Sequence, residues 1–210
     1  MVQPLERTLN MIDIAHPLYF VRHGQTDWNA LARYQGSTDT SLSELGKHEA
    51  QRNGKLLAAR LQADQVELSQ LQLVSSPLKR ARQTSEIISS CFDPHPPVTI
   101  NPVFRELSAG RWEGLTSIQV KERYYEERKS RKLDRWLFKP QGGESMAERS
   151  DEIENGLREL SPNSVLITHC VVLRIIFHLL TDFGKQAATS VETPHVSIWC
   201  WNGVKLHRQD

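Results

Sequence analysis

The chain has few cysteines, and their arrangement excludes several classes of protein. Its 210 residues include three cysteines, Cys91, Cys170 and Cys200, and no Cys-x-x-Cys pair occurs. An odd number of widely spaced cysteines argues against a disulfide framework and against a structural zinc site. We therefore expect reduced thiols in a cytoplasmic protein.

The sequence also lacks an excess of charge and a long apolar run. The 26 Lys and Arg residues nearly balance the 25 Asp and Glu residues, so no global charge favours nucleic acid or an anionic membrane as a partner. No apolar stretch approaches the length of a membrane span, and residues 1–16 lack the continuous apolar core of a signal peptide. We expect residues 1–16 to be a loosely held extension and residues 17–210 to form one domain, of unknown oligomeric state.

Short apolar runs alternate with helical patterns along this domain. Strands are predicted at 18–21, 71–74, 98–100 and 164–168. Helices are predicted to follow the caps Ser43 and Ser76, with Pro77 at the first helical position of the second. Further helices are predicted from Thr116, after the loop 141–145 as far as about Leu160, and over 171–180. A closing hairpin is predicted from 195–201 and 204–207, around a two-residue Asn202-Gly203 turn. This order predicts a three-layer α/β/α fold with a mostly parallel central sheet and an antiparallel edge strand.

A basic pair stands at the end of the first predicted strand. Arg22 and His23 follow the apolar run, and Gly24 allows the backbone to turn sharply after them. Ligands of open α/β sheets bind at the carboxyl ends of the strands, and arginine beside histidine there favours an anion such as phosphate. Taken alone, the same residues also fit a surface turn without chemistry.

Three further residues are expected at the same edge of the sheet. His169 follows the strand at 164–168 in the way that His23 follows the first strand. Arg80 lies in the first turn of a predicted helix and is expected to point back toward His23, whereas Lys79 and Arg82 are interpreted as a solvated face. Glu106 lies in the loop that leads to Gly110. These five residues predict a phosphate site.

In their order along the chain, these motifs resemble the histidine phosphatase family, also called the phosphoglycerate mutase-like family. The resemblance is carried by Val21–Asn29, by Ser75–Thr84, by Arg105–Leu107 with Gly110 and Trp112–Gly114, by Gly142–Ser145 and by Leu166–His169. It covers nearly the whole chain after residue 17. It implies a metal-independent phosphomonoesterase without a cofactor, which acts on a small phosphorylated metabolite through a phosphohistidine.

The resemblance also implies a role for each residue. His23 would be the nucleophile, with one ring nitrogen donating to a backbone carbonyl. Arg22, Arg80 and His169 would bind the phosphoryl oxygens. Glu106 would protonate the leaving oxygen and then activate water. The polar residues Thr26, Asn29, Gln35 and Gly36 are expected to line the phosphate site.

Several alternatives remain open. A phosphoglycerate mutase would use the same His23, but the segment Leu107–Gly114 resembles the phosphatase branch; a non-catalytic binder of phosphorylated ligands is a third possibility. The basic segment 115–141 fits either a solvated face or a substrate lid. Cys170 departs from the glycine common in the family, and either an inert thiol or an oxidant sensor is consistent with it.

Overall fold

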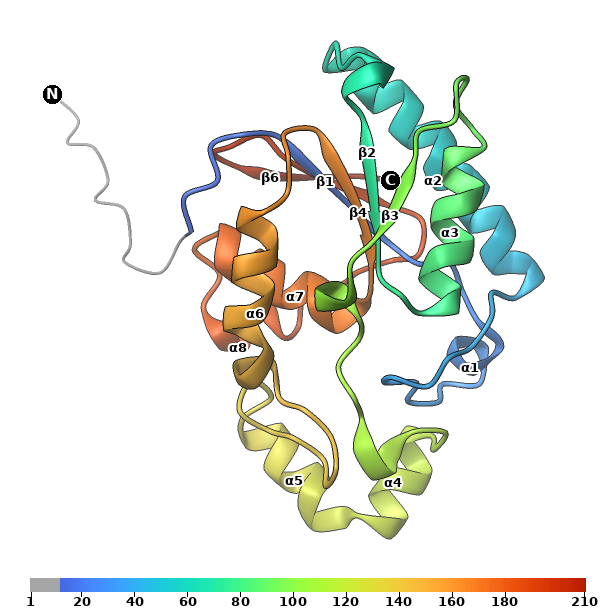
Figure 1. Ribbon diagram of the computed structural model, residues 1–210. Coiled ribbons are helices and arrows are strands. Elements are labelled where there is room, and N and C mark those ends of the chain that lie inside the picture. The colour runs from blue at the N-terminus through green and yellow to red at the C-terminus, as the bar shows by residue number, and fades with distance from the viewer. Residues whose placement is uncertain (1–11) are drawn as a thin grey trace, which may run out of the picture.

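The computed structural model describes residues 12–210, in which a six-stranded sheet carries helices on both faces (Figure 1). The strands are β1 (Leu18–Arg22), β2 (Gln72–Ser75), β3 (Val98–Ile100), β4 (Ser164–Thr168), β5 (Ile198–Trp201) and β6 (Leu206–Gln209). Their order is β3-β2-β4-β1-β5-β6. The first four pair in parallel, whereas β5 is antiparallel to β1 and β6 is antiparallel to β5. The predicted sheet with its antiparallel edge is confirmed.

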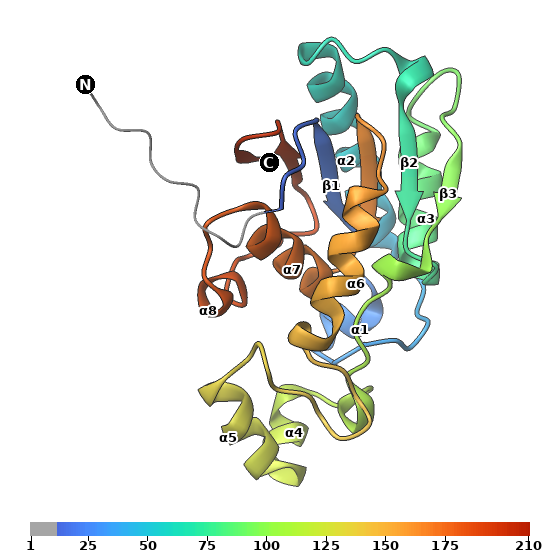
Figure 2. The ribbon, with the colours of Figure 1, turned by 60° about the vertical axis from the view of Figure 1, so that its left-hand side comes forward.

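The helices form two covering layers and a separate group. They are α1 (Asp27–Ala30), α2 (Glu44–Ala63), α3 (Lys79–Ser89), α4 (Ser117–Arg123), α5 (Tyr125–Leu133), α6 (Met146–Arg158), α7 (Cys170–Leu180) and α8 (Lys185–Ala188). Helices α2 and α3 cover one face of the sheet and α6 and α7 the other, while α4 and α5 lie beyond one end of the strands (Figure 2).

Alternating side chains of the strands build a core on each face. In β1, Leu18 and Phe20 belong to the cluster under α6 and α7, whereas Tyr19 and Val21 belong to the cluster under α2 and α3. Neighbouring residues of a strand point to opposite faces, so a strand that is apolar at every position must be covered on both sides. This is why the predicted apolar runs require a three-layer fold.

The carboxyl ends of three adjacent strands lie level with one another. Arg22 pairs with Thr168 across β1 and β4, and Ser75 pairs with Ile167 across β2 and β4. The pairing continues one residue beyond the strands, because the His23 amide donates to the Thr168 carbonyl. Residues that follow β1, β2 and β4 therefore meet at one edge.

Two local predictions are wrong. Helix α3 begins at Lys79, because Leu78 has an extended backbone (φ −70°, ψ 138°) and no side chain caps the helix; Ser76 is therefore not its N-cap, and Pro77 is outside it. In the final hairpin the Asn202 amide donates to the Lys205 carbonyl, so the two enclosed residues are Gly203 and Val204 rather than Asn202 and Gly203, and β6 begins only at Leu206.

The segment before β1 packs against the domain where the structure describes it. Ile12 and Ile14 are buried, and the Trp201 indole donates to the Ile14 carbonyl. The expectation of a loosely held extension is therefore wrong for residues 12–16, and its remainder, residues 1–11, lies outside the described residues. Between residues 12 and 210, no helix is both long enough and apolar enough to cross a membrane.

Candidate active site

His23 is buried at the end of β1 with a defined tautomer. Its Nδ1 lies 2.7 Å from the Gly24 carbonyl oxygen. A carbonyl oxygen only accepts hydrogen bonds, so Nδ1 carries the proton and Nε2 keeps its lone pair. Burial lowers the pKa of His23 well below its usual range, and the nearby His169, Arg80 and Arg22 lower it further. His23 is thus neutral at physiological pH, with Nε2 available as a nucleophile.

His169 lies across from His23 at the end of β4. The two ring centroids are 5.1 Å apart, and His169 Nε2 lies 2.7 Å from Ser76 Oγ. Ser76 Oγ accepts from the Leu78 amide and can donate its own hydrogen to His169 Nε2, an arrangement in which the proton of His169 is on Nδ1. Among the described residues, that Nδ1 is buried without a partner. Burial, Arg80 and Arg22 lower the pKa of His169 well below its usual range.

Both predicted arginines are anchored at the tip of the guanidinium and unpaired at Nε. Arg22 donates to the Thr193 carbonyl (2.7 Å), and Arg80 donates to the Thr38 and Gly36 carbonyls (2.8 and 2.9 Å). Each Nε is buried and has no hydrogen-bond partner among residues 12–210. Carbonyl partners fix the two side chains without neutralising them, so both positive charges remain available to an anion.

Glu106 reaches the same edge from the segment that follows β3. The Thr168 hydroxyl holds the Phe104 carbonyl (2.8 Å), and the Glu106 carboxylate accepts from the amides of Leu107 and Val171. Burial raises the pKa of Glu106, although Arg80 and these two amides oppose the shift. A carboxyl group with a raised pKa is suited to proton donation.

The four polar residues predicted to line the site have structural partners. Thr26 caps α1, and its hydroxyl lies within hydrogen-bond distance of Gln35 Oε1 and Asn29 Oδ1. The Asn29 and Gln35 side-chain amide nitrogens have no partner in the part of the chain that the structure describes. Gly36 has φ +53°, a conformation that favours glycine, and its carbonyl holds Arg80.

Sequence reasoning missed His195. Its Nδ1 donates to the His23 carbonyl (2.7 Å), and its ring centroid lies 5.6 Å from that of His23. Burial and Arg22 lower the pKa of His195 to about 4. The residue precedes β5, which runs antiparallel to β1, so the beginning of β5 lies at the edge where β1 ends. The predicted antiparallel edge strand was the available signal.

Two other neighbours of the site are noteworthy. Cys170 is half-buried at the start of α7, where the Thr193 hydroxyl lies 3.1 Å from its sulfur. Glu113, in the loop after Glu106, accepts hydrogen bonds from the backbone and hydroxyl of Ser37 and from the Thr38 hydroxyl.

Within residues 12–210, no cluster of three or more His, Cys, Asp or Glu side chains is placed to hold a metal ion.

The exposed residues Lys79 and Arg82 confirm the solvated face predicted for α3.

The basic segment 115–141 holds α4 and α5 beside the candidate site, where Arg131, Arg135 and Phe138 line a cavity together with residues that flank Glu106. A wholly solvated face does not describe this placement, and the substrate lid stays a prediction.

Comparison with known proteins agrees with this geometry. A phosphoserine phosphatase 1 of Hydrogenobacter thermophilus is 32% identical over 180 residues, covering 80% of this chain and 78% of that protein. A metal-independent phosphoserine phosphatase of Arabidopsis thaliana is 30% identical, covering 88% and 78%. The structure of a mycobacterial glucosyl-3-phosphoglycerate phosphatase complexed with VO3 matches with a TM-score of 0.75 and 25% identity, covering 93% and 97%. Proteins named as probable phosphoglycerate mutases are also similar.

The family model for the histidine phosphatase superfamily (branch 1) matches residues 18–205, which include all five predicted catalytic residues. The chain belongs to the histidine phosphatase superfamily.

Proposed function

We propose that the protein hydrolyses the phosphate monoester of a small metabolite through a phosphohistidine at His23 Nε2. One observation carries the proposal. Three buried nitrogens without partners, Arg22 Nε, Arg80 Nε and His169 Nδ1, belong to the groups whose charge or proximity depresses the pKa of His23. Buried donors are almost always satisfied, so three unpaired nitrogens on residues near His23 support a site for an acceptor with several oxygens. A phosphoryl group is such an acceptor.

In the first step, the lone pair of His23 Nε2 forms a bond to phosphorus as the bond to the ester oxygen breaks. Arg22, Arg80 and the Nδ1–H of His169 hold the non-bridging oxygens throughout. Glu106, whose pKa burial raises, gives a proton from its carboxyl form to the departing alcohol oxygen. The products of this step are the free alcohol, a phosphohistidine and a Glu106 carboxylate.

In the second step, water attacks the phosphohistidine. The Glu106 carboxylate takes a proton from the water, the new oxygen–phosphorus bond forms, and the phosphorus–nitrogen bond breaks. Inorganic phosphate leaves, and both His23 and Glu106 return to their starting protonation states. The hydrogen bond from Nδ1 to Gly24 keeps the same ring nitrogen available in every cycle.

The proposal is tested by phosphate release from p-nitrophenyl phosphate and from a panel of metabolite esters, in the presence of EDTA. We expect turnover by the wild type and none by His23→Ala. His48→Ala is the matched control, because His48 is exposed on α2. An acid-labile phosphoenzyme should be trapped in the wild type and absent from His23→Ala.

Other outcomes would change the assignment. Activity that is abolished by EDTA, or that survives in His23→Ala, would refute the phosphohistidine route. Interconversion of 2- and 3-phosphoglycerate without phosphate release would favour a mutase, and binding of inorganic phosphate without any turnover would favour a non-catalytic binder.

A further inference from the structure

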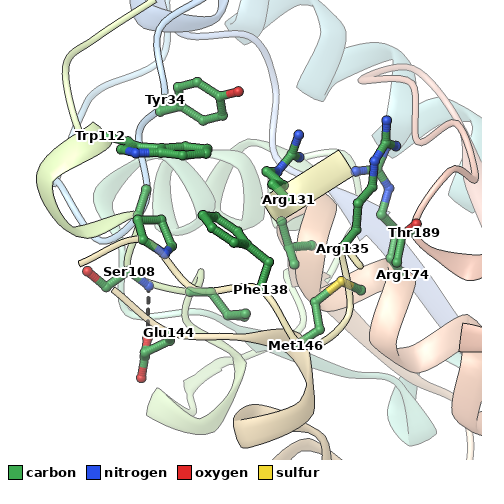
Figure 3. A pocket seen from close by; sticks show the side chains of 14 residues that line it. Tyr34, Ser108, Trp112, Arg131, Arg135, Phe138, Glu144, Met146, Arg174 and Thr189 are labelled. Carbon is green, nitrogen blue, oxygen red and sulfur yellow. Dashed lines mark hydrogen bonds between the residues drawn. The ribbon is translucent and has the colours of Figure 1, made fainter. Parts of the chain in front are cut away.

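A cavity of about 120 Å³ is lined in part by Leu107, Ser108 and Ala109, the segment that follows Glu106 (Figure 3). Leu107 and Val171, whose amides hold the Glu106 carboxylate, both line it. Because Glu106 is the proposed donor to the leaving oxygen, a cavity that begins at its two hydrogen-bond partners lies on the leaving-group side of the phosphate site. Its contents would be the alcohol part of the substrate.

Three arginines from two separate parts of the chain line this cavity. Arg131 belongs to α5, Arg135 follows α5, and Arg174 lies on α7. Their guanidinium groups are gathered on one side of the cavity (Figure 3). Burial and the charges of Arg135 and Arg174 lower the pKa of Arg131. Like charges brought together in a partly buried place are unfavourable unless an anion joins them.

No carboxylate of the described chain forms a salt bridge with this cluster. Arg174 donates to the Val191 carbonyl and Arg135 to the Ser190 hydroxyl, both of which are neutral. The cavity has one acidic lining residue, Glu144, and its carboxylate is already held by both terminal nitrogens of Arg105. The positive charge of the cluster is therefore uncompensated within residues 12–210.

The opposite wall of the cavity is aromatic. Trp112 packs against Tyr34 and against Phe138, with ring centroids 5.2 Å apart in each pair. Trp112 itself is fixed, because its indole nitrogen donates to Glu127. An alcohol that enters the cavity would thus contact a rigid apolar surface on one side and three cationic groups on the other.

We propose that this cavity is an anion subsite: Arg131, Arg135 and Arg174 bind a second anionic group, a carboxylate or a phosphate, carried by the alcohol part of the phosphate ester. Guanidinium groups bind both kinds of anion with paired hydrogen bonds. The inference rests on the proposed phosphatase function and adds the class of substrate to it.

The experiment compares kcat/KM for four esters that differ in the second group. Phosphoserine and 3-phosphoglycerate carry a carboxylate, fructose 1,6-bisphosphate carries a second phosphate, and glycerol 3-phosphate carries neither; p-nitrophenyl phosphate reports the basal chemistry. We expect kcat/KM to be higher for the esters with a carboxylate, or for the ester with a second phosphate, than for glycerol 3-phosphate. Which of the two kinds of ester is preferred shows whether the subsite binds a carboxylate or a phosphate.

The arginine variants then locate the preference. Arg131→Gln and Arg174→Gln should lower the ratio of kcat/KM for the preferred ester to that for p-nitrophenyl phosphate by about 10- to 100-fold, the range expected for charged hydrogen bonds. Arg131→Lys should lose less, because it keeps the charge. Lys132→Gln is the matched control: it removes one positive charge from the neighbouring, exposed residue of α5 and should leave the ratio unchanged.

The outcomes separate the subsite from the phosphatase proposal. Equal turnover of glycerol 3-phosphate and the acidic esters, with p-nitrophenyl phosphate still hydrolysed, would refute the subsite alone. Arginine variants that lose both activities in proportion would also refute it, since that loss indicates a general structural effect. Absence of all turnover, including that of p-nitrophenyl phosphate, would overturn both proposals.

Discussion

At the residue scale, the environments of His23 and Glu106 shift the pKa values of the two side chains in opposite directions. Both are buried, but burial acts in opposite directions on a base and an acid: it lowers the pKa of His23 and raises that of Glu106. A neutral imidazole and a protonated carboxyl group are the forms that nucleophilic attack and leaving-group protonation require. Burial therefore shifts both groups toward the forms that the first chemical step requires.

Glu106→Gln tests the carboxyl group at nearly constant volume. The amide cannot protonate a departing alkoxide, so hydrolysis of alkyl phosphates should fall by roughly 10²- to 10⁴-fold. With p-nitrophenyl phosphate, whose leaving group needs little protonation, the first step should survive while the second slows. Stopped-flow measurement should then show a burst of nitrophenolate equal to the enzyme concentration. Alkyl ester hydrolysis near the wild-type rate would exclude Glu106 as the acid.

Four of the five predicted catalytic residues lie at an end of a recognisable strand or helix. Arg22, His23 and His169 end apolar strands, and a parallel sheet brings such ends together whatever its loops do. His195 escaped notice because its place depends on β5 being antiparallel to β1, which aligns the start of one strand with the end of the other. Ser76 was assigned as a cap, because Ser-Pro before a helical pattern does not reveal that Leu78 is extended.

At the element scale, Glu113 joins the loop that holds Arg80 to the loop that follows Glu106. Its carboxylate accepts from Ser37 and Thr38 on one loop and from Ser108 and Ala109 on the other. Burial alone would raise the pKa of Glu113, but the hydrogen bonds from Thr38 and Ser37 outweigh it and the net shift is downward. The loop so anchored supplies the carbonyls that hold the Arg80 guanidinium. We therefore infer that Glu113 positions Arg80 without touching the substrate.

Glu113→Ala should weaken phosphate binding through Arg80. Five donors from four residues lose their acceptor, so we expect the free energy of unfolding to fall by about 1–3 kcal/mol. The inhibition constant of inorganic phosphate should rise about tenfold, as expected for loss of roughly one charged hydrogen bond. Urea unfolding and product inhibition of p-nitrophenyl phosphate hydrolysis measure the two effects.

Glu148→Ala is the matched control for this prediction. Glu148 completes the capping box of α6 and is exposed, so its removal should cost stability and leave phosphate inhibition unchanged. If both variants weaken phosphate binding equally, Glu113 has only a general structural role.

The placement of α4 and α5 could not be derived from the sequence. Their charge pattern fitted a solvated face as well as a lid, because both present basic residues on short helices. Their placement depends on contacts with Arg174, which lies on a different helix and lines the same cavity, and with Trp112. Long-range contacts of this kind leave no periodic signal in the segment itself.

At the scale of the whole molecule, the buried histidines make the fold sensitive to acid. His23, His169 and His195 have lowered pKa values, so the unfolded chain binds protons at a higher pH than the folded protein does. The free energy of unfolding must then fall as the pH falls below the ordinary histidine value, by up to about 1.4 kcal/mol per pH unit for each group. The raised pKa of Glu106 acts in the opposite direction above its ordinary value.

His195→Asn isolates one contribution to this dependence. The asparagine amide retains a donor for the His23 carbonyl but does not titrate. With a folded pKa of about 4, His195 should account for at most about 2 kcal/mol of the stability that the wild type loses between pH 7.5 and pH 5. The variant should lose correspondingly less over this range, as measured by urea unfolding at both pH values. The Glu106 contribution is common to both proteins and cancels in the comparison.

His207→Asn provides the control, because His207 is exposed on β6 and its imidazole contacts water in both the folded and the unfolded chain. It should lose as much stability as the wild type does between pH 7.5 and pH 5. If His195→Asn also matches the wild type, His195 does not resist protonation in the folded state. The acid sensitivity would then have to come from His23 and His169, the two histidines that the proposed chemistry requires to be neutral.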